Sequence, residues 1–132
     1  MEKILTFIIY NHKLLLLLGS DKAPQFHESF WYTTTGACED IDLTLEDTVR
    51  REVKEETNLE LDKVIDLKWS FEYASLGNHC LEHAFISYAK TSEVILNKES
   101  IDYRWCDLDE FLDLIKWYDD KQVLKEKIEI YI

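Results

Sequence analysis

The amino-acid sequence predicts an α+β or mixed α/β domain, in which a sheet and helices are arranged in layers. Runs rich in β-branched and aromatic residues come first, an amphipathic helix interrupts them, and helical periodicity returns at the end of the chain. The sequence contains no low-complexity linker, internal repeat or abrupt change of composition. Because 132 residues is the size of one ordinary domain, we expect a single domain over residues 1–132.

The first third of the chain predicts three strands. Two apolar runs, residues 4–10 and 13–18, flank an Asn-His turn at 11–12, and they predict a hairpin of two buried strands. Residues 19–29 are polar and hold the single proline, which is typical of a loop. The aromatic and β-branched run 30–35 predicts a short strand.

The remaining elements follow from a change of period. Apolar residues recur with helical spacing from Leu45 to about Asn58. Four further strands are predicted, with a turn around residues 77–78 after the first: Asp62–Tyr73, Cys80–Ala89, Glu93–Leu96 and Tyr103–Cys106. Two helices are predicted at the end of the chain: Leu108–Trp117 and Lys121–Ile130.

The charge balance excludes polymer-binding functions. Twenty-seven acidic residues against fifteen basic ones give a net charge of −12, which repels nucleic-acid phosphates and anionic membrane surfaces. A small phosphorylated metabolite or nucleotide is compatible with this charge if a divalent cation mediates the contact. Three widely spaced cysteines, without an apparent signal peptide or an apolar span of about 20 residues, lead us to expect a soluble cytoplasmic protein.

The central helix places acidic residues on its buried face. Its apolar stripe is made by Leu45, Val49 and Val53, which fall between about 20° and about 100° when Glu52 is set at 0°. Glu56 falls at about 40°, inside the stripe, and Glu55 falls on its flank. Unpaired buried carboxylates are costly, and clustered oxygen ligands suit Mg²⁺ or Mn²⁺. The alternative is an acidic cluster neutralised by arginine, since Arg51 lies beside Glu55.

The two ends of this helix are also predicted. Asn58 is placed to close the helix in the left-handed conformation, which Asn tolerates. Either Asp42 or Thr44 can supply the oxygen that caps the first turn.

Residues 51–59, REVKEETNL, resemble the second half of the Nudix box, GX5EX7REUXEEXGU, in which U is aliphatic. Gly36 and Ala37 stand where the glycine pair opens the box. Counting back from Arg51 places Ala37 at the first box glycine and Leu43 at the first box glutamate. The chain is therefore identified as a divergent member of the Nudix family.

This resemblance implies the Nudix fold, a mixed β-sheet sandwiched between helices, and a hydrolase of phosphoric anhydride bonds that uses Mg²⁺ or Mn²⁺. It implies metal ligation by three carboxylates and one carbonyl, from Glu52, Glu55, Glu56 and Gly36. Arg51 would orient a glutamate. Glu99 resembles a downstream acid that supplies a further ligand or the general base, and the base remains open between Glu52 and Glu99. A homodimer is also compatible with the resemblance.

The flanking residues 30–36, FWYTTTG, and Glu99 with Tyr103 and Trp105 are similar to those of bacterial dihydroneopterin triphosphate pyrophosphatases, a Nudix subgroup also described as cleaving dATP. The resemblance implies cleavage of a nucleoside or pterin triphosphate to a monophosphate plus pyrophosphate. The alternatives are a Nudix hydrolase of a nucleoside diphosphate linked to another group (a sugar, ADP-ribose or a dinucleoside polyphosphate) and a catalytically weak Nudix nucleotide-binding module.

Residues for substrate binding are predicted before the helix. Trp31 and Tyr32, with Phe26 and Phe30, offer flat faces on which a purine or pterin stacks. Lys22 is a candidate contact for a phosphate. The alternative is that the aromatic residues belong to the core and that the lysine is a solvated surface residue.

Overall fold

A computed structural model describes residues 1–19 and 29–132. Its strands are β1 (Glu2–Tyr10), β2 (Lys13–Gly19), β3 (Trp31–Tyr32), β4 (Thr34–Ala37), β5 (Leu61–Ser75), β6 (Asn78–Ala89) and β7 (Ser100–Cys106). Its helices are α1 (Leu45–Thr57), α2 (Leu108–Leu114) and α3 (Lys121–Ile128), and α3 continues into a 3₁₀ turn, Glu129–Tyr131.

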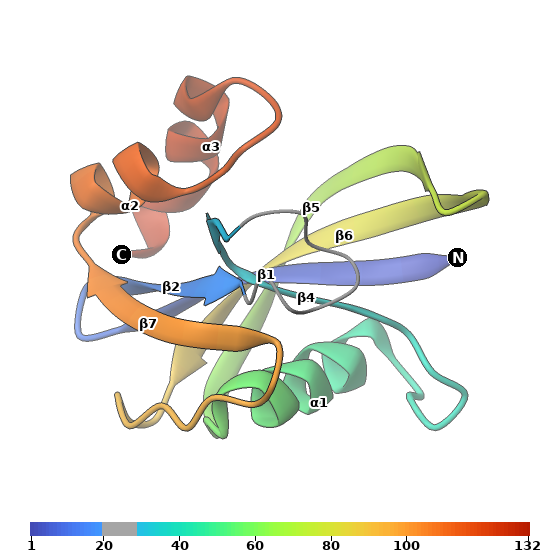
Figure 1. Ribbon diagram of the computed structural model, residues 1–132, viewed down its shortest axis with the longest axis horizontal. Coiled ribbons are helices and arrows are strands. Elements are labelled where there is room, and N and C mark those ends of the chain that lie inside the picture. The colour runs from blue at the N-terminus through green and yellow to red at the C-terminus, as the bar shows by residue number, and fades with distance from the viewer. Residues whose placement is uncertain (20–28) are drawn as a thin grey trace.

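The described strands form a seven-stranded sheet of order β3-β2-β1-β6-β5, with β4 paired to β1 and β7 paired to β2. Strands β1 and β6 are parallel, and the other pairs are antiparallel. Helix α1 lies on one side of the sheet, and α2 and α3 lie on the other (Figure 1). The predicted mixed sheet between helices is thereby confirmed.

The sheet divides between β1 and β2. These strands pair at Ile9 with Leu14 and at Tyr10 with Lys13, next to their connecting turn. Farther from the turn, β1 pairs with β4, while β2 pairs with β3 and β7. The divergence opens a space in the middle of the fold, and the residues that line the cavity described below come from its two sides.

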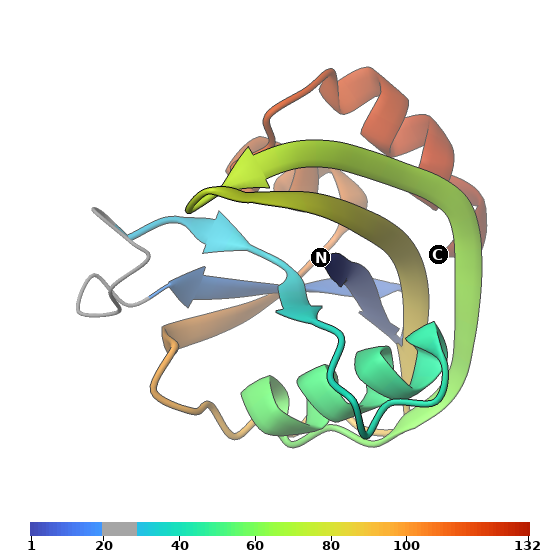
Figure 2. The ribbon, with the colours of Figure 1, turned by 90° about the vertical axis from the view of Figure 1, so that its right-hand side faces the viewer.

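Two hydrophobic clusters hold the layers together. On the α1 side, Val49 and Val53 are fully buried against strand residues such as Ile4 and Ile8. The other cluster lies under α2 and α3, and it contains the β1 side chains that point to the opposite side of the sheet, such as Leu5. Figure 2 shows the long β5–β6 hairpin arching from the α1 side of the molecule toward the C-terminal helices.

The predicted strand at Glu93–Leu96 is wrong. Residues 91–97 have no regular secondary structure, because the backbone there bonds to the end of α1, with Ile95 N–H donating to the Thr57 carbonyl at 2.9 Å. Val94 and Leu96 still pack against the cluster on the α1 side. The alternation of apolar residues over 93–96 therefore arises from the partial burial of Val94 and Leu96 in an irregular segment and not from a strand.

Among the other differences from the predicted boundaries, two arise because backbone groups find partners outside their own element. Helix α2 ends at Leu114 instead of residue 117, since residue 115 is extended and Lys116 N–H donates to the Trp31 carbonyl at 2.9 Å. The strand predicted over 30–35 is divided into β3 and β4 at Thr33, whose hydroxyl donates to the Thr6 carbonyl. Residues 20–28 of the predicted loop lie outside the described residues.

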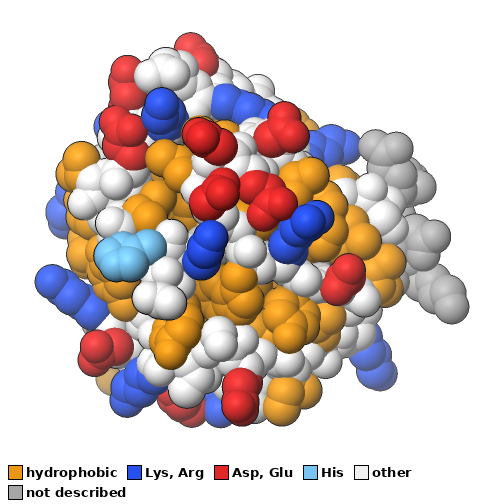
Figure 3. Space-filling model, turned by 90° about the vertical axis from the view of Figure 1, so that its left-hand side faces the viewer, with side chains coloured by type: hydrophobic (Ala, Val, Ile, Leu, Met, Phe, Trp, Pro, Cys, Tyr) orange, Lys and Arg blue, Asp and Glu red, His pale blue; other side chains and the backbone are white. Residues whose placement is uncertain are grey.

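Charged side chains of both signs are distributed around hydrophobic ones on the face shown in Figure 3. Acidic residues are therefore not confined to α1. Among the described helices, none has the length and apolar character needed to cross a bilayer.

Candidate functional site

Both ends of α1 are fixed by side chains. Thr44, one of the two predicted caps, accepts a hydrogen bond from Asp47 N–H at 3.1 Å, and the Asp47 carboxylate accepts one from Thr44 N–H at 3.2 Å. This reciprocal arrangement is a capping box. Asn58 ends the helix with φ 62°, as predicted. The orientation of the helix faces is therefore set locally.

Two glutamates of α1 turn inward and a third does not. Glu56 is 7% exposed, and its Oε2 atom is buried without a hydrogen-bond partner among the described residues. The side chain of Glu52 is 12% exposed, whereas that of Glu55 is 54% exposed. The helical wheel placed Glu56 inside the apolar stripe and Glu55 on its flank, and the exposures follow that order.

Arg51 connects the acidic residues around the helix. Its Nη1 atom lies 2.9 Å from Glu52 Oε1 and 2.9 Å from Glu39 Oε2, and 3.4 Å from Glu55 Oε2. The guanidinium is largely buried, so these contacts are less screened by water than surface pairs are. Arg51 thus fixes one oxygen of Glu52, and this arrangement corresponds to the orienting role that the resemblance implied.

Asp42 binds the other side of the same guanidinium. Its carboxylate accepts from Arg51 Nη2 at 2.8 Å and Nε at 3.1 Å, and from Thr48 Oγ1 at 2.9 Å. The Arg51 hydrogen bonds hold the pKa of Asp42 below its ordinary range. Leu43, at the position of the first box glutamate, is 89% exposed. The carboxylate that supports the loop before α1 therefore comes from the preceding residue.

Gly36 gives the backbone of β4 direct access to Glu52. A Cβ atom on residue 36 would lie 2.0 Å from Cδ and 2.4 Å from Oε1 of Glu52. Residue 36 is paired with Ile4 in the sheet, so the backbone cannot easily withdraw. Glycine accommodates this close approach without displacing the Glu52 side chain.

A cavity of about 1120 Å³ joins this acidic region to an aromatic one. Its acidic end includes Gly36, Glu52, Glu56 and Glu99. Its aromatic end includes rings from three elements or connections: Tyr32, Phe71, Trp117 and Tyr118. The volume is sufficient for a small organic ligand.

Burial and neighbouring acids raise the pKa of two glutamates at this end of the cavity, Glu56 and Glu52. Burial raises the pKa of Glu56 well above its ordinary value, and the neighbouring charges of Glu99 and Glu52 raise it further. Burial also raises the pKa of Glu52, and this rise is opposed by its hydrogen bond from Arg51. Mutual repulsion between buried carboxylates is relieved by a cation.

The cavity brings together Gly36, Glu52, Glu56, Glu99 and Tyr32 of the predicted site residues. Arg51 and Glu55 lie beside Glu52, outside the lining, and Trp31 packs against the core cluster under α2 and α3. Lys22 and Phe26 lie outside the described residues. Within the described ranges, no three His, Cys, Asp or Glu side chains form a ready-made metal site.

The sequence interpretation did not include Glu82, Trp117 or Tyr118, which also line the cavity. Glu82 had a detectable signal, because it stands between Cys80 and Ala84 at the two-residue period of a buried strand face. Both aromatic residues follow α2, Trp117 at the end of the predicted helix Leu108–Trp117 and Tyr118 just beyond it.

Comparisons with known proteins agree with this architecture. A family model described as NUDIX domain matches residues 3–127. The E. coli dihydroneopterin triphosphate pyrophosphohydrolase superposes with a TM-score of 0.73 and 22% identity, over 95% of this chain and 92% of that one. No match was found among curated proteins.

Two further solved structures share the fold. The NUDIX domain of Shewanella oneidensis NrtR, complexed with ADP ribose, has a TM-score of 0.74 and 17% identity over 100% of this chain and 88% of that one. A C. elegans Ap4A hydrolase has a TM-score of 0.73 and 17% identity over 98% and 96% of the two chains.

Replacing Glu56 by Gln is expected to stabilise the metal-free protein. The pKa of Glu56 is raised above its ordinary value of 4.5, so the folded state holds a proton that the unfolded state loses as the pH rises above about 4.5. The free energy of unfolding of the wild type therefore falls as the pH rises through this range, and the Glu56→Gln variant lacks this loss. We expect the variant to be more stable by about 1 kcal/mol or more at pH 8.

Urea denaturation in the presence of a chelator, at pH 5 and pH 8, measures this difference. The gain should shrink toward pH 5. Glu93→Gln, at an exposed site away from the cavity, is the matched control and should show no such pH-dependent gain. An equal stability of wild type and Glu56→Gln at pH 8 would contradict the prediction.

Proposed function

The chain belongs to the Nudix hydrolase family, and from this premise we propose that it is a divalent-metal-dependent pyrophosphohydrolase of nucleoside or pterin triphosphates. The observation that carries the proposal is the buried, unpartnered Oε2 atom of Glu56 beside Glu52 and Glu99, in a cavity with an aromatic far end. One end suits a charged phosphate chain, and the other suits a flat heterocycle.

The donor set fits Mg²⁺ or Mn²⁺. We propose that Glu52 and Glu56, with the Gly36 carbonyl, hold the cation and that Glu55 contributes from the edge of the site. Mg²⁺ is commonly held by one or two carboxylates together with substrate phosphates and water, so three converging side chains are not required. When bound, the metal neutralises phosphate charge and lowers the pKa of a coordinated water.

The protein's own residues then have separate tasks. Arg51 holds one oxygen of Glu52, which lines the cavity, through a charge-assisted hydrogen bond. Glu52 or Glu99 accepts the proton of the water that attacks phosphorus. The bond between the α and β phosphoryl groups breaks, and pyrophosphate leaves. At the other end, Tyr32 is proposed to position the heterocycle, whereas Trp31, which packs against the core cluster, lies outside the lining. Lys22 is proposed to contact a phosphate.

A substrate panel with Mg²⁺ tests the proposed reaction. We expect dATP, dGTP or dihydroneopterin triphosphate to yield a monophosphate and pyrophosphate. Production of AMP and a sugar phosphate from nucleoside diphosphate sugars, without cleavage of triphosphates, would assign the chain to the alternative hydrolase class. Ligand-dependent thermal stabilisation without turnover would identify a nucleotide-binding module, which the departure at Leu43 makes the relevant alternative.

Glu56→Gln is expected to lower kcat by about 100-fold or more, because one carboxylate of the metal site is lost while the fold is retained. Pyrophosphate release with the best substrate of the panel measures the effect, and circular dichroism verifies folding. Glu93→Gln should retain wild-type turnover. Near-normal turnover of Glu56→Gln would remove this residue from the site.

Gly36→Ala is expected to impair activity more than stability. The added methyl overlaps the end of the Glu52 side chain, which can rotate away because it is flexible, but only by leaving its position beside Arg51. We expect a fall of about tenfold or more in kcat/KM, since a displacement of about 1 Å at a reacting group is costly. Ala37→Gly, at the neighbouring position in β4, is the control. Unchanged kcat/KM in Gly36→Ala would show that the close approach is not needed.

A further inference from the structure

A second buried acid lies in the cavity and has no task in the proposed cleavage. Glu82 is on β6 and is 6% exposed. The Tyr73 hydroxyl donates to its Oε2 atom at 3.1 Å. No Arg, Lys or His forms an ion pair with Glu82 among the residues that the structure describes. The carboxylate therefore retains acceptor capacity that the protein does not use.

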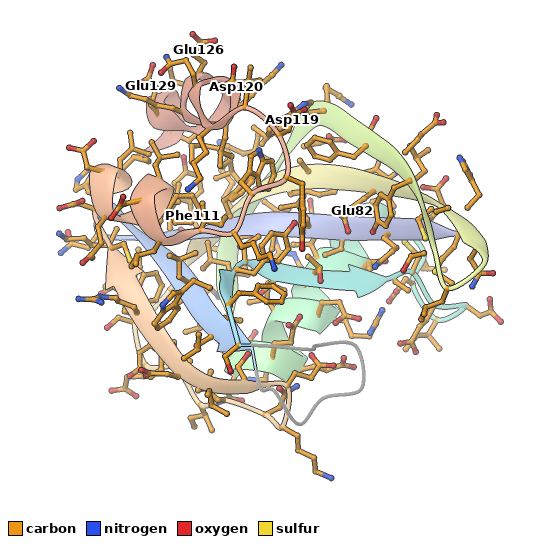
Figure 4. All side chains as sticks on the ribbon, turned by 45° about the horizontal axis from the view of Figure 1, so that its top comes forward. Glu82, Phe111, Asp119, Asp120, Glu126 and Glu129 are labelled. Carbon is orange, nitrogen blue, oxygen red and sulfur yellow. The ribbon has the colours of Figure 1, made fainter. Side chains whose placement is uncertain are left out.

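Glu82 lies on the side of the sheet opposite α1. It is paired with Lys3 in the parallel register that next pairs Leu5 with Ala84, and these two residues belong to the cluster under α2 and α3. Figure 4 shows Glu82 and Asp119 on this side, Asp119 being in the connection that follows α2. Glu82 thus occupies a position at which the strand pattern would otherwise place an apolar side chain.

The surroundings of Glu82 suit a flat ring. Tyr32 and Trp117 are stacked at 29° with centroids 6.4 Å apart, and Phe71 meets Trp117 edge-on at 5.7 Å. All three line the same cavity as Glu82. The Trp117 Nε1 atom is buried without a hydrogen-bond partner among the described residues. An acceptor and an unused donor therefore accompany the aromatic rings at this end.

We propose that Glu82 determines the specificity for the base, by accepting two hydrogen bonds from a 2-amino-4-oxopyrimidine ring, the edge that guanine and pterins share. The inference rests on the proposed function and names its substrate class. This edge presents a ring N–H next to an exocyclic amino group, and an ionised carboxylate is an acceptor with about four lone-pair sites. Two parallel N–H···O bonds to one carboxylate form a specific, charge-assisted pair.

Other bases fit this acceptor less well. The corresponding edge of adenine has an acceptor ring nitrogen next to a C–H group, so it offers no N–H donor and one carboxylate oxygen would face a nitrogen lone pair. Hypoxanthine keeps the ring N–H and lacks the amino group. Burial raises the pKa of Glu82, and the nearby charge of Lys3 and the hydrogen bond from Tyr73 oppose this rise only in part. Two N–H donors from a ligand would offset the remaining cost of burying the carboxylate.

A purely structural role is the competing explanation, because the bond from Tyr73 links β5 to β6. The Glu82→Gln variant distinguishes this structural role from the proposed role in base specificity. The amide oxygen of Gln can still accept from the Tyr73 hydroxyl, but the NH₂ group faces the ligand's donors. A structural role predicts an equal effect on all substrates, whereas the proposed role predicts a change in selectivity.

The first experiment uses the wild-type protein and compares kcat/KM with Mg²⁺ for dGTP, dITP, dATP and dihydroneopterin triphosphate. We expect dGTP or dihydroneopterin triphosphate to exceed both dITP and dATP by about tenfold or more, the discrimination typical of a paired hydrogen bond. The ratio of kcat/KM for dGTP to that for dihydroneopterin triphosphate shows whether the preferred ring is guanine or a pterin. Equal values for dGTP, dITP and dATP, with dihydroneopterin triphosphate no better, would overturn the proposal.

The second experiment repeats the comparison with Glu82→Gln and with Glu93→Gln as the matched control. The first variant should lose about tenfold or more on the preferred substrate and little on dATP, and the second should behave as wild type. Retained selectivity in Glu82→Gln would overturn the proposal.

A binding measurement keeps the inference separate from catalysis. Quenching of tryptophan fluorescence by GMP, IMP and AMP without metal reports on the aromatic end of the cavity alone. Tighter binding of GMP by about tenfold supports the proposal, and equal binding of all three overturns it. If no triphosphate is cleaved and GMP still binds selectively, the proposed function fails while the base-binding role of Glu82 stands.

Discussion

The contact on which the site depends is the nearly buried guanidinium of Arg51 between Asp42 and Glu52. One side of the guanidinium binds Asp42, in the loop that follows β4. The other side binds Glu52, which lines the cavity. The pKa of Arg51 is raised by these two acids, so its charge is constant at any physiological pH. Removal of Arg51 would leave both of these carboxylates without their cationic partner. The loop, the helix and the inward glutamate are thus coupled through one residue.

The position of that site follows from strand pairing. Strands β1 and β2 separate after their turn, and β3 and β4 pair with one of them each. The opening therefore runs through the sheet and receives side chains from both layers, acidic ones from α1 and aromatic ones from the opposite side. A binding space formed in this way is built into regular elements, which hold side chains more rigidly than loops do.

Local patterns predicted those parts of the molecule that are determined locally. The wheel placed Glu56 among apolar residues, and the αL position of Asn58 followed from its place at the end of the helix. Predictions failed where backbone groups bond to distant segments, as at Ile95 with Thr57 and Lys116 with Trp31. The sequence places several acids near Leu43 but does not single out Asp42 as the one that binds Arg51, because a motif count fixes positions in the chain and not the direction of a side chain. Glu82 had the period of a buried strand face, but its neighbours in the cavity come from β3, β5 and the segment after α2.

Two carboxylates, Glu56 and Glu82, occupy positions at which an apolar residue would stabilise the fold, one on each side of the sheet. Within the described part of the chain neither forms a direct ion pair, although the charge of Lys3 acts on Glu82, and both line one cavity. Elsewhere the two clusters are made of aliphatic and aromatic side chains with almost complete burial, so these acids are local exceptions in a well-packed core. These two carboxylates are buried at opposite ends of the same cavity. One ligand that brings positive charge to Glu56 and N–H donors to Glu82 accounts for both of them.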